Sequence, residues 1–266
     1  MPPTVWMRCP SRFDIAFAIG LLACVAGSRA QEAESDEAAA KHWRNLRQAE
    51  FQEFSLQRET DQPTMLALES RPVLNWSNPE RGTRDGALFL WTDEGRPQMV
   101  ACAYEFGGSL KQEFHSLSAD PILAERDGNA VHRFGPGVEW KDLPDAPKAV
   151  AQRGLRLTQM RRIAERFRVS IVKSETRLLP QPVFRSPMTA AADVAVFVFV
   201  QGTDPECTLL VEATADKEWR YALARQTRWG ISVHLDDQLV WDESVFAKTD
   251  SPFLVLSKKP SPSGTP

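Results

Sequence analysis

VAVFVFVQGTDPECTLLVEA, residues 194–213, places a short polar turn between two apolar runs. Positions 194–200 contain no polar residue, so a strand made from them needs apolar partners on both faces of its sheet. The turn QGTDPE (201–206) supplies Gly and Pro, which suit a tight connection. The pattern predicts two adjacent antiparallel strands in the interior. It leaves open whether QGTDPE is only a turn or part of a functional loop.

A similar arrangement lies about 108 residues earlier, where DGALFLW (85–91) is followed by TDEGRPQ (92–98). Pro97 aligns with Pro205. Other matches follow in the same order, all at offsets of about 105 to 110 residues, and they place Glu105 near Glu212. The ordered series predicts an internal duplication.

The two copies of the turn differ in charge. Asp204 and Glu206 stand where the earlier copy has Arg96 and Gln98. If either copy has a function, we expect this asymmetry to mark it.

The fold class that follows is α+β, with two pseudo-symmetric repeats that share one core. Each repeat is a helix followed by a four- to five-stranded antiparallel sheet. The helices are expected from about residue 36 to 56 and from 148 to 168. Asp127-Gly128 predicts a tight hairpin in the first repeat. The expected division is a leader at 1–30, a first repeat at 31–134, a Gly/Pro linker at 135–147, a second repeat at 148–250 and a disordered tail at 251–266.

The first thirty residues have the pattern of an export signal peptide. Arg8 and Arg12 precede the apolar run IAFAIGLLACVA (15–26), which is too short to span a membrane. Cleavage after Ala30 would make Gln31 the first mature residue. The alternative is a lipoprotein, with lipidation at Cys24 in the lipobox-like LLAC.

Removal of the leader takes away three arginines and one aspartate, which moves the formal net charge from −3 to −5. A mildly acidic exported chain lacks the basic surface of a nucleic-acid-binding protein, so no nucleic-acid partner is expected. No later segment is long and apolar enough for a transmembrane helix. The mature chain is therefore expected in the periplasm, in the cell envelope or secreted.

Two cysteines, Cys102 and Cys207, remain after cleavage at Ala30. Export permits a disulfide between them. Both also lie in apolar strand-like runs, where a free thiol behaves as a small hydrophobe. The sequence leaves the two possibilities open.

The chain lacks the common phosphate-binding, nucleophile-elbow and zinc-binding motifs, and no cofactor or metal site is predicted. His115 beside Ser116 and Ser118 in EFHSLS (113–118) is the best base-and-nucleophile candidate. Neighbouring residues in a strand point to opposite faces, so His115 and Ser116 are not expected to meet.

Glu105 and Glu212 end apolar strands at corresponding places in the two copies. A pseudo-twofold axis could bring these carboxylates together as in a glycoside hydrolase. The alternative is that charged residues simply end apolar strands at the surface.

The second helix is rich in arginine and could face an anionic partner. Its other interpretation is a solvated face tied by ion pairs to acidic neighbours. The residues concerned are Arg153, Arg156, Arg161, Arg162, Arg166 and Arg168.

Seven tryptophans follow the leader, and most lie in strand or helix patterns that indicate core packing. Trp140, in a Gly/Pro loop, and Trp229, before Gly230, are the two expected to be exposed.

Several motifs together resemble an uncharacterised family of exported proteins from planctomycete bacteria. They are PVLNW (72–76), DGALFLW (85–91), EFHSLS (113–118), PGVEW (136–140), RLLPQPVF (177–184) and FVQGTDPE (199–206). The resemblance covers residues 40 to 242 and implies export and a duplicated architecture. It carries no assigned activity, so no catalytic residue is transferred.

Two function classes remain. One is a non-catalytic cell-envelope protein that binds a glycan, a peptide or a protein partner in a groove between the repeats. The other is a glycosidase-like hydrolase with a carboxylate site in the same place.

Overall fold

The computed structural model describes residues 41, 45–188, 192–245 and 252–259 of the chain. The chain divides into two compact units, residues 1–46 and residues 47–266, and the second unit holds every described strand. The predicted leader, with cleavage after Ala30 or lipidation at Cys24, lies outside the described residues.

The second unit starts with helical residues 47–52 and continues with strands. Those of the first half are β1 (Phe54–Arg58), β2 (Thr64–Met65), β3 (Ala67–Leu68), β4 (Leu74–Asn78), β5 (Thr83–Asp93), β6 (Arg96–Phe106), β7 (Ser109–Ser116), β8 (Ile122–Arg126) and β9 (Asn129–Phe134), with the 3-10 helix η1 (Pro79–Arg81) before β5.

The first half closes with the short strand β10 (Lys141–Asp142), and the second half opens with the helix α2 (Arg153–Ala164). The strands that follow are β11 (Phe167–Ile171), β12 (Ser174–Glu175), β13 (Arg177–Leu178), β14 (Phe184–Arg185), β15 (Asp193–Gln201), β16 (Asp204–Ala213), β17 (Trp219–Arg225), β18 (Ile231–Leu235), β19 (Gln238–Glu243) and β20 (Phe253–Lys258).

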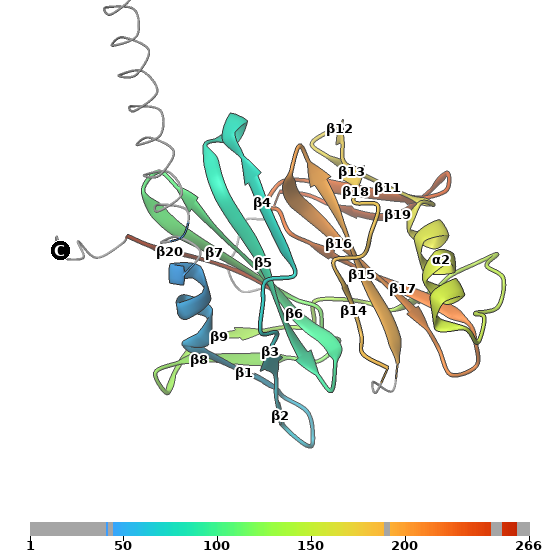
Figure 1. Cartoon of the computed structure of the whole chain (residues 1–266), viewed down its shortest axis with the longest axis horizontal. Helices are drawn as coiled ribbons and strands as arrows, with labels where there is room; N and C mark the ends of the chain where they lie inside the picture. The colour runs from blue at the N-terminus through green and yellow to red at the C-terminus, as the bar shows by residue number, and fades with distance from the viewer. Residues whose placement is uncertain (1–40, 42–44, 189–191, 246–251, 260–266) are drawn as a thin grey trace, which may run out of the picture. The chain divides into compact units, whose positions relative to one another are not determined.

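The described strands form four antiparallel sheets (Figure 1). Sheet I has the order β20-β7-β6-β5-β3, and β4 also pairs with β5. Sheet II has the order β10-β17-β16-β15-β13, and β14 also pairs with β15. Two four-stranded sheets complete the set, sheet III (β2-β1-β8-β9) and sheet IV (β12-β11-β18-β19).

Two strands cross between the halves of the chain. β10 follows β9 in sequence but pairs with β17 of sheet II. β20 follows β19 but pairs with β7 of sheet I. Each six-stranded sheet therefore takes one edge strand from the other half.

Sheets I and II pack face to face through a buried apolar cluster. Leu88, Leu90 and Val100 of sheet I belong to it together with Val198 and Leu210 of sheet II. The two sheets lie next to each other in the middle of Figure 1. Residues of both apolar runs therefore lie in this cluster, and buried residues between positions 143 and 235 form a further core cluster.

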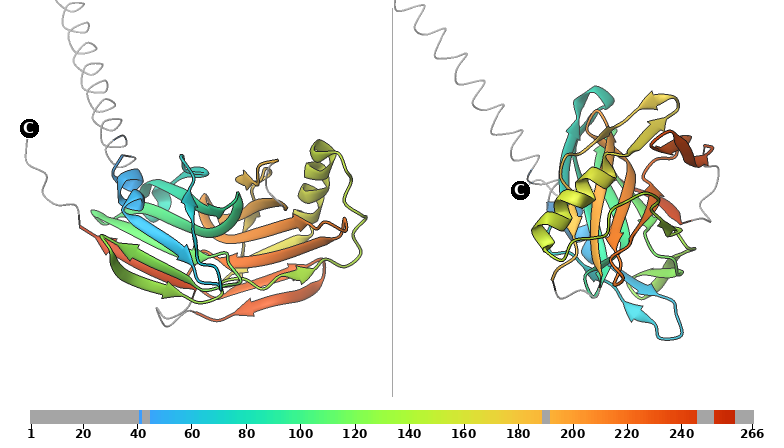
Figure 2. Two further views of the ribbon diagram at one scale, coloured as in Figure 1. Left: turned by 90° about the horizontal axis from the view of Figure 1, so that it is seen from below. Right: turned by 90° about the vertical axis from the view of Figure 1, so that its right-hand side faces the viewer.

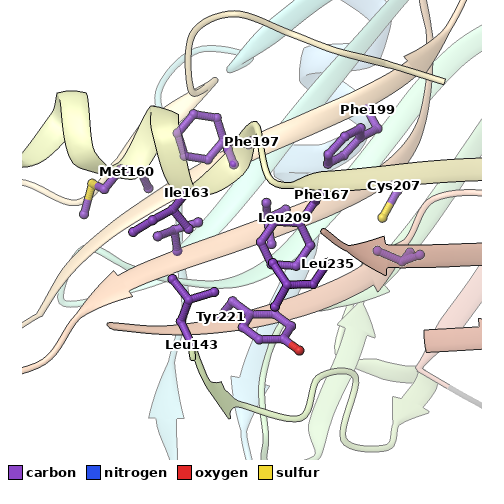
Figure 3. Packing of buried hydrophobic residues seen from close by; sticks show 14 of the residues in the cluster. Leu143, Met160, Ile163, Phe167, Phe197, Phe199, Cys207, Leu209, Tyr221 and Leu235 are labelled. Atoms are coloured by element: carbon purple, nitrogen blue, oxygen red, sulfur yellow. The ribbon is translucent and has the colours of Figure 1, made fainter. Parts of the chain in front are cut away.

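The outer face of sheet II is covered by α2 and sheet IV. Met160 and Ile163 of α2 and Phe167 of β11 pack in one cluster with Phe197 and Leu209 (Figure 3). Figure 2 shows α2 on the side of sheet II that faces away from sheet I. Alternate residues of β15 thus enter two different cores, which explains why the strand lacks polar alternation.

Aromatic side chains cover the outer face of sheet I. Phe51, in the helical segment 47–52, lies 4.6 Å from Phe89 of β5 between ring centroids. Phe54 of β1 lies 5.0 Å from Phe114 of β7. A helix and a four-stranded sheet therefore cover sheet I as well.

Both long hairpins shift register at the same point. The shift falls between Trp91 and Thr92 in β5–β6 and between Phe199 and Val200 in β15–β16. A proline follows on the partner strand in each case, Pro97 or Pro205, and both are buried. Proline cannot donate a ladder hydrogen bond, so a bulge suits its position.

Several expected boundaries were wrong. The first helical segment ends at residue 52 rather than 56, because β1 begins at Phe54. α2 is shorter than 148–168, because Phe167, Val169 and Ile171 alternate inward as a strand. The hairpin at Asp127-Gly128 is confirmed, with φ angles of 52° and 72°.

Two segments expected to lack strands contain them. Residues 141–142 of the linker form β10, and residues 253–258 of the expected disordered tail form β20. Phe253 and Leu254 are buried, and β20 pairs with β7 over six residues. The Pro/Ser composition beyond Lys258 concealed a short apolar strand, FLVL, that is stable only because β7 offers it an edge.

We expect a chain that ends at Ser251 to unfold at lower urea concentration than the full chain. It loses the burial of Phe253 and Leu254, each worth about 1.5 to 3 kcal/mol. A chain that ends at Lys259 is the control and should match the full chain within about 0.5 kcal/mol. Equal stability of the two truncated chains would contradict the structural role of β20.

Candidate functional site

The turn QGTDPE lies beside a pocket of about 580 Å³, called here the turn pocket. The start of β16 and the residues after β17 line it from sheet II, and β6, β7 and β20 line it from sheet I. Asp204 and Glu206 are both among its lining residues. The acids that distinguish the later turn from the earlier one are therefore placed in a cavity at the border of the two sheets.

Glu113 of β7 lies in the same pocket and was not singled out from the sequence. Tyr104 donates a hydrogen bond to its carboxylate at 2.8 Å. Burial raises the pKa of Glu113 to about 7, the hydrogen bond from Tyr104 opposes this, and the charges of Asp204 and Glu206 add to it. Carboxylates from both sheets thus influence one another here.

The loop after β17 supplies the polar and aromatic remainder of the pocket. Trp229 is 58 % exposed, although the side chain is large and apolar. Buried Arg225 holds this loop in place by donating to the carbonyl oxygens of Thr227 at 3.0 Å and Trp229 at 2.6 Å. The expected exposure of Trp229 is confirmed, and its ring borders the cavity.

Gln226 also lines the pocket and is buried. Its amide nitrogen donates to the Thr208 hydroxyl. Its Oε1 has no hydrogen-bond partner among the described residues. A buried acceptor without a partner costs free energy, so a donor brought by a ligand would be stabilising there.

Glu212 has different surroundings. It is buried and forms ion pairs with Arg96 of β6 at 2.6 Å and Arg220 of β17 at 2.7 Å. Both guanidinium groups lie over the ring of Trp140, at 4.9 Å and 4.8 Å from its centroid. Trp140 is half-buried rather than exposed, because these two cations enclose it.

The structure does not bring Glu105 and Glu212 together. Arg96, which contacts Glu212, begins β6, and Glu105 lies nine residues further along that strand. Nine residues of strand span roughly 30 Å. The separation exceeds the roughly 10 Å limit of an inverting pair even after the reach of an arginine is allowed for. Glu105 instead accepts a hydrogen bond from the Gly108 amide at 2.7 Å.

His115 and Ser116 line a second pocket of about 440 Å³. Burial, together with the charge of Arg225, lowers the pKa of His115, and its ring stacks on Phe253 at 4.3 Å. The Nε2 atom of His115 has no hydrogen-bond partner among the described residues, so it is not bonded to Ser116. Ser116 Oγ accepts from the Ser118 amide at 3.3 Å. A nucleophile-and-base pair is not formed.

Ion pairs account for most of the arginine-rich face. Arg153 and Arg156 contact Asp193 at 3.3 Å and 2.5 Å, and Arg185 joins the same carboxylate at 2.6 Å. Burial alone would raise the pKa of Asp193, but the hydrogen bonds from Arg185 and Arg156 bring it below its usual value. This cluster fastens the start of α2 to sheet II.

The remaining four arginines differ in their position relative to α2 and in their ion pairing. Arg166 pairs with Asp236 and Arg168 with Asp237, and both lie beyond the end of α2. Arg161 is half-buried and Arg162 exposed in its last turn. Hence the six residues form no single free face for an anionic partner, and the ion-paired alternative describes four of them.

Cys102 and Cys207 are free and buried. They belong to different clusters, Cys102 to the core between sheets I and II and Cys207 to the core beneath α2. Burial raises the pKa of both thiols. The disulfide considered from the sequence is not formed, and both residues pack as small hydrophobes.

The chain matches no protein-family model, no curated protein and no solved structure. Among the described residues, no cluster of three or more His, Cys, Asp or Glu side chains is suited to hold a metal ion. None of the helices in the described ranges has the length and apolar character needed to cross a membrane. The turn pocket is therefore the feature of the described residues that points to a function.

The raised pKa of Glu113 predicts a pH-dependent stability. Because this pKa rises from 4.5 to about 7, the folded chain retains a proton that the unfolded chain has released in that window. The free energy of unfolding contributed by Glu113 therefore falls as pH rises from about 4.5 to 7. Glu113→Gln lacks this titration and therefore this loss. The free energy of unfolding of the wild type minus that of the variant should decrease as pH rises from about 4.5 to 7.

Urea unfolding at several pH values measures this difference. Titrating groups that do not interact with Glu113 contribute equally to both proteins and cancel. Glu105→Gln, at the half-buried end of β6 and outside the turn pocket, is the matched control and should keep the wild-type profile. A wild-type-minus-Glu113→Gln difference that stays constant or increases with pH would contradict the assignment.

Proposed function

We propose that this chain is an exported, non-catalytic binding module whose ligand enters the turn pocket. The observation that carries the proposal is the pocket itself. It opens at the border of two sheets and combines an exposed tryptophan, three carboxylates and a buried amide oxygen that lacks a partner. Binding sites typically combine an apolar surface with a few converging polar groups.

The proposed export rests on the sequence of residues 1–30. Basic residues, a short apolar run and small residues before Gln31 have the order of a cleavable signal. A location in the periplasm, the envelope or the medium follows from it. The proposed kinship with exported planctomycete proteins rests instead on the motifs between residues 40 and 242. A lipid anchor at Cys24 is the variant form of this proposal.

The proposed architecture is a pair of structural repeats. Four observations support it: matching strand orders in sheets III and IV, matching orders in sheets I and II, hairpin bulges at matching positions, and the exchange of β10 and β20 between the six-stranded sheets. Each proposed repeat differs from the expected one in its number of strands, since nine described strands rather than four or five lie between residues 54 and 134.

Glycoside hydrolysis is the second candidate, and one observation favours it. Glu113 has its pKa raised to about 7 beside Asp204 and Glu206, the combination that suits a general acid next to an ionised carboxylate. In that function Glu113 would protonate the leaving oxygen of a glycoside. The residues differ from Glu105 and Glu212, but the site again lies between the halves.

The export proposal predicts a mature chain that begins at Gln31. Expression of the full chain in a bacterium, followed by cell fractionation and mass spectrometry of the N-terminal peptide, measures this. The variant Ala30→Lys should retain the leader, because the peptidase requires a small residue there. A lipid-modified peptide starting at Cys24 would show the anchored form, and an uncleaved cytoplasmic wild-type chain would contradict export.

The binding proposal predicts that Trp229→Ala weakens ligand affinity by about tenfold, since a stacking surface is lost. Calorimetry on residues 31–266, with neutral oligosaccharides, acidic oligosaccharides and tripeptides as probes, measures the affinity. Leu239→Ala is the matched control, because Leu239 is similarly exposed but does not line the pocket.

Mass spectrometry of the recovered probe separates the two candidate functions. Intact probe supports binding alone. Cleaved oligosaccharide that disappears with Glu113→Gln supports hydrolysis. A probe bound equally by wild type and Trp229→Ala would contradict both.

A further inference from the structure

We propose that the ligand of the turn pocket is an uncharged, hydroxyl-rich ring, the sugar of a neutral glycan. In the pocket this ring takes the position that corresponds to Trp140 at the other end of the core between sheets I and II. This inference deepens the proposed binding function and rests on it. The two ends of the contact between sheets I and II correspond residue by residue.

The strand registers place Trp140 and Val255 at matching positions. Lys141 of β10 pairs with Tyr221 of β17, and Tyr221 pairs with Val211 of β16. Val211 lies four residues after Cys207, the last residue of β16 that is paired before the register shift. Trp140 directly precedes Lys141.

Sheet I repeats this pattern. Leu256 of β20 pairs with Gln112 of β7, and Gln112 pairs with Ala103 of β6. Ala103 lies four residues after Met99, the last residue of β6 that is paired before the register shift. Val255 directly precedes Leu256, so Val255 occupies in sheet I the place that Trp140 occupies in sheet II.

The neighbours of these two residues also match. Arg96 and Asp204 each begin the strand after a hairpin turn. Glu212 pairs with Arg220 across β16–β17, and Tyr104 pairs with Lys111 across β6–β7. The register thus relates Glu212 to Tyr104, and not to Glu105 as the sequence alignment suggested.

One end is filled and the other is hollow. At the filled end, the Trp140 ring lies against Arg96 and Arg220, and both arginines form ion pairs with Glu212. At the hollow end, Val255 replaces the indole, and the pocket of about 580 Å³ lies beside it. Trp140 therefore shows that the sheet geometry accepts a flat ring at this position.

The charges of the hollow end favour a neutral ligand. Two acidic residues of the lining, Asp204 and Glu206, are matched by two basic ones, Lys111 and Arg228. The pKa of the third acid, Glu113, is raised to about 7, so this carboxyl takes up a proton near neutral pH. A lining with no large net charge offers little attraction for an ion.

The acceptors of the hollow end favour hydroxyl donors. Carboxylate oxygens and the unpartnered Oε1 of buried Gln226 accept hydrogen bonds, and a sugar ring carries several hydroxyl donors. An indole or phenol ring offers one donor at most. The exposed ring of Trp229 provides the flat apolar surface on which the C–H face of a sugar can stack.

The test uses residues 31–266 with neutral, acidic and basic oligosaccharides and with tripeptides that contain tryptophan, measured by calorimetry. The variant Val255→Trp fills the pocket as Trp140 fills the other end. We expect it to weaken binding of neutral oligosaccharides by more than about tenfold. Its melting temperature should stay equal to that of wild type or rise, because it fills a cavity. Leu239→Trp, at an exposed position outside the pocket, should bind as wild type does.

A second variant tests the same proposal if Val255→Trp fails to fold. Trp229→Ala alters an exposed side chain and should also weaken neutral-sugar binding by about tenfold. Binding of charged oligosaccharides or peptides that both variants weaken, with no binding of neutral sugars, would overturn the ligand class but keep the proposed function. Absence of any binding that the two variants weaken would overturn both.

Discussion

A strand that is apolar on both faces is stable only between two layers, and β5 and β15 are such strands. Their sheets meet face to face, so each supplies one of the two layers that the other needs. The second layer comes from a helix and a four-stranded sheet on each outer side, with Phe51 over Phe89 in one case and Met160 near Phe197 in the other. This contact makes residues 47–266 one unit rather than two.

The exchange of edge strands follows from the same contact. Because sheets I and II lie against each other, the chain leaving one half reaches the open edge of the other within a few residues. β10 and β20 cover those edges next to β17 and β7. Covered edges are protected from pairing with other chains, and the exchange adds main-chain hydrogen bonds to the side-chain packing.

The ends of the shared core differ because of a few substitutions on one geometry. Where Arg96, Arg220 and Trp140 are present, Glu212 is neutralised and the space is filled. Where Asp204 and Val255 stand instead, carboxylates accumulate and the space is open. Desolvation then raises the pKa of Glu113, since none of the described cations forms an ion pair with it, whereas two do so with Glu212. The same strand arrangement thus gives a filled, ion-paired end around Trp140 and an open polar pocket beside Val255.

Local sequence determined the features that depend on neighbouring residues. The apolar runs at 85–91 and 194–200 require burial on both faces, Pro97 and Pro205 require an irregular ladder, and Asp127-Gly128 forms a hairpin. The acids Asp204 and Glu206 could be recognised as unusual because they interrupt a repeated pattern. Only the tertiary structure decided the ends of the helices, the pairing of β20, the enclosure of Trp140 and the importance of Glu113. Each depends on which distant segment covers a residue, and burial by distant segments, rather than local propensity, determines strand pairing, desolvation and pKa.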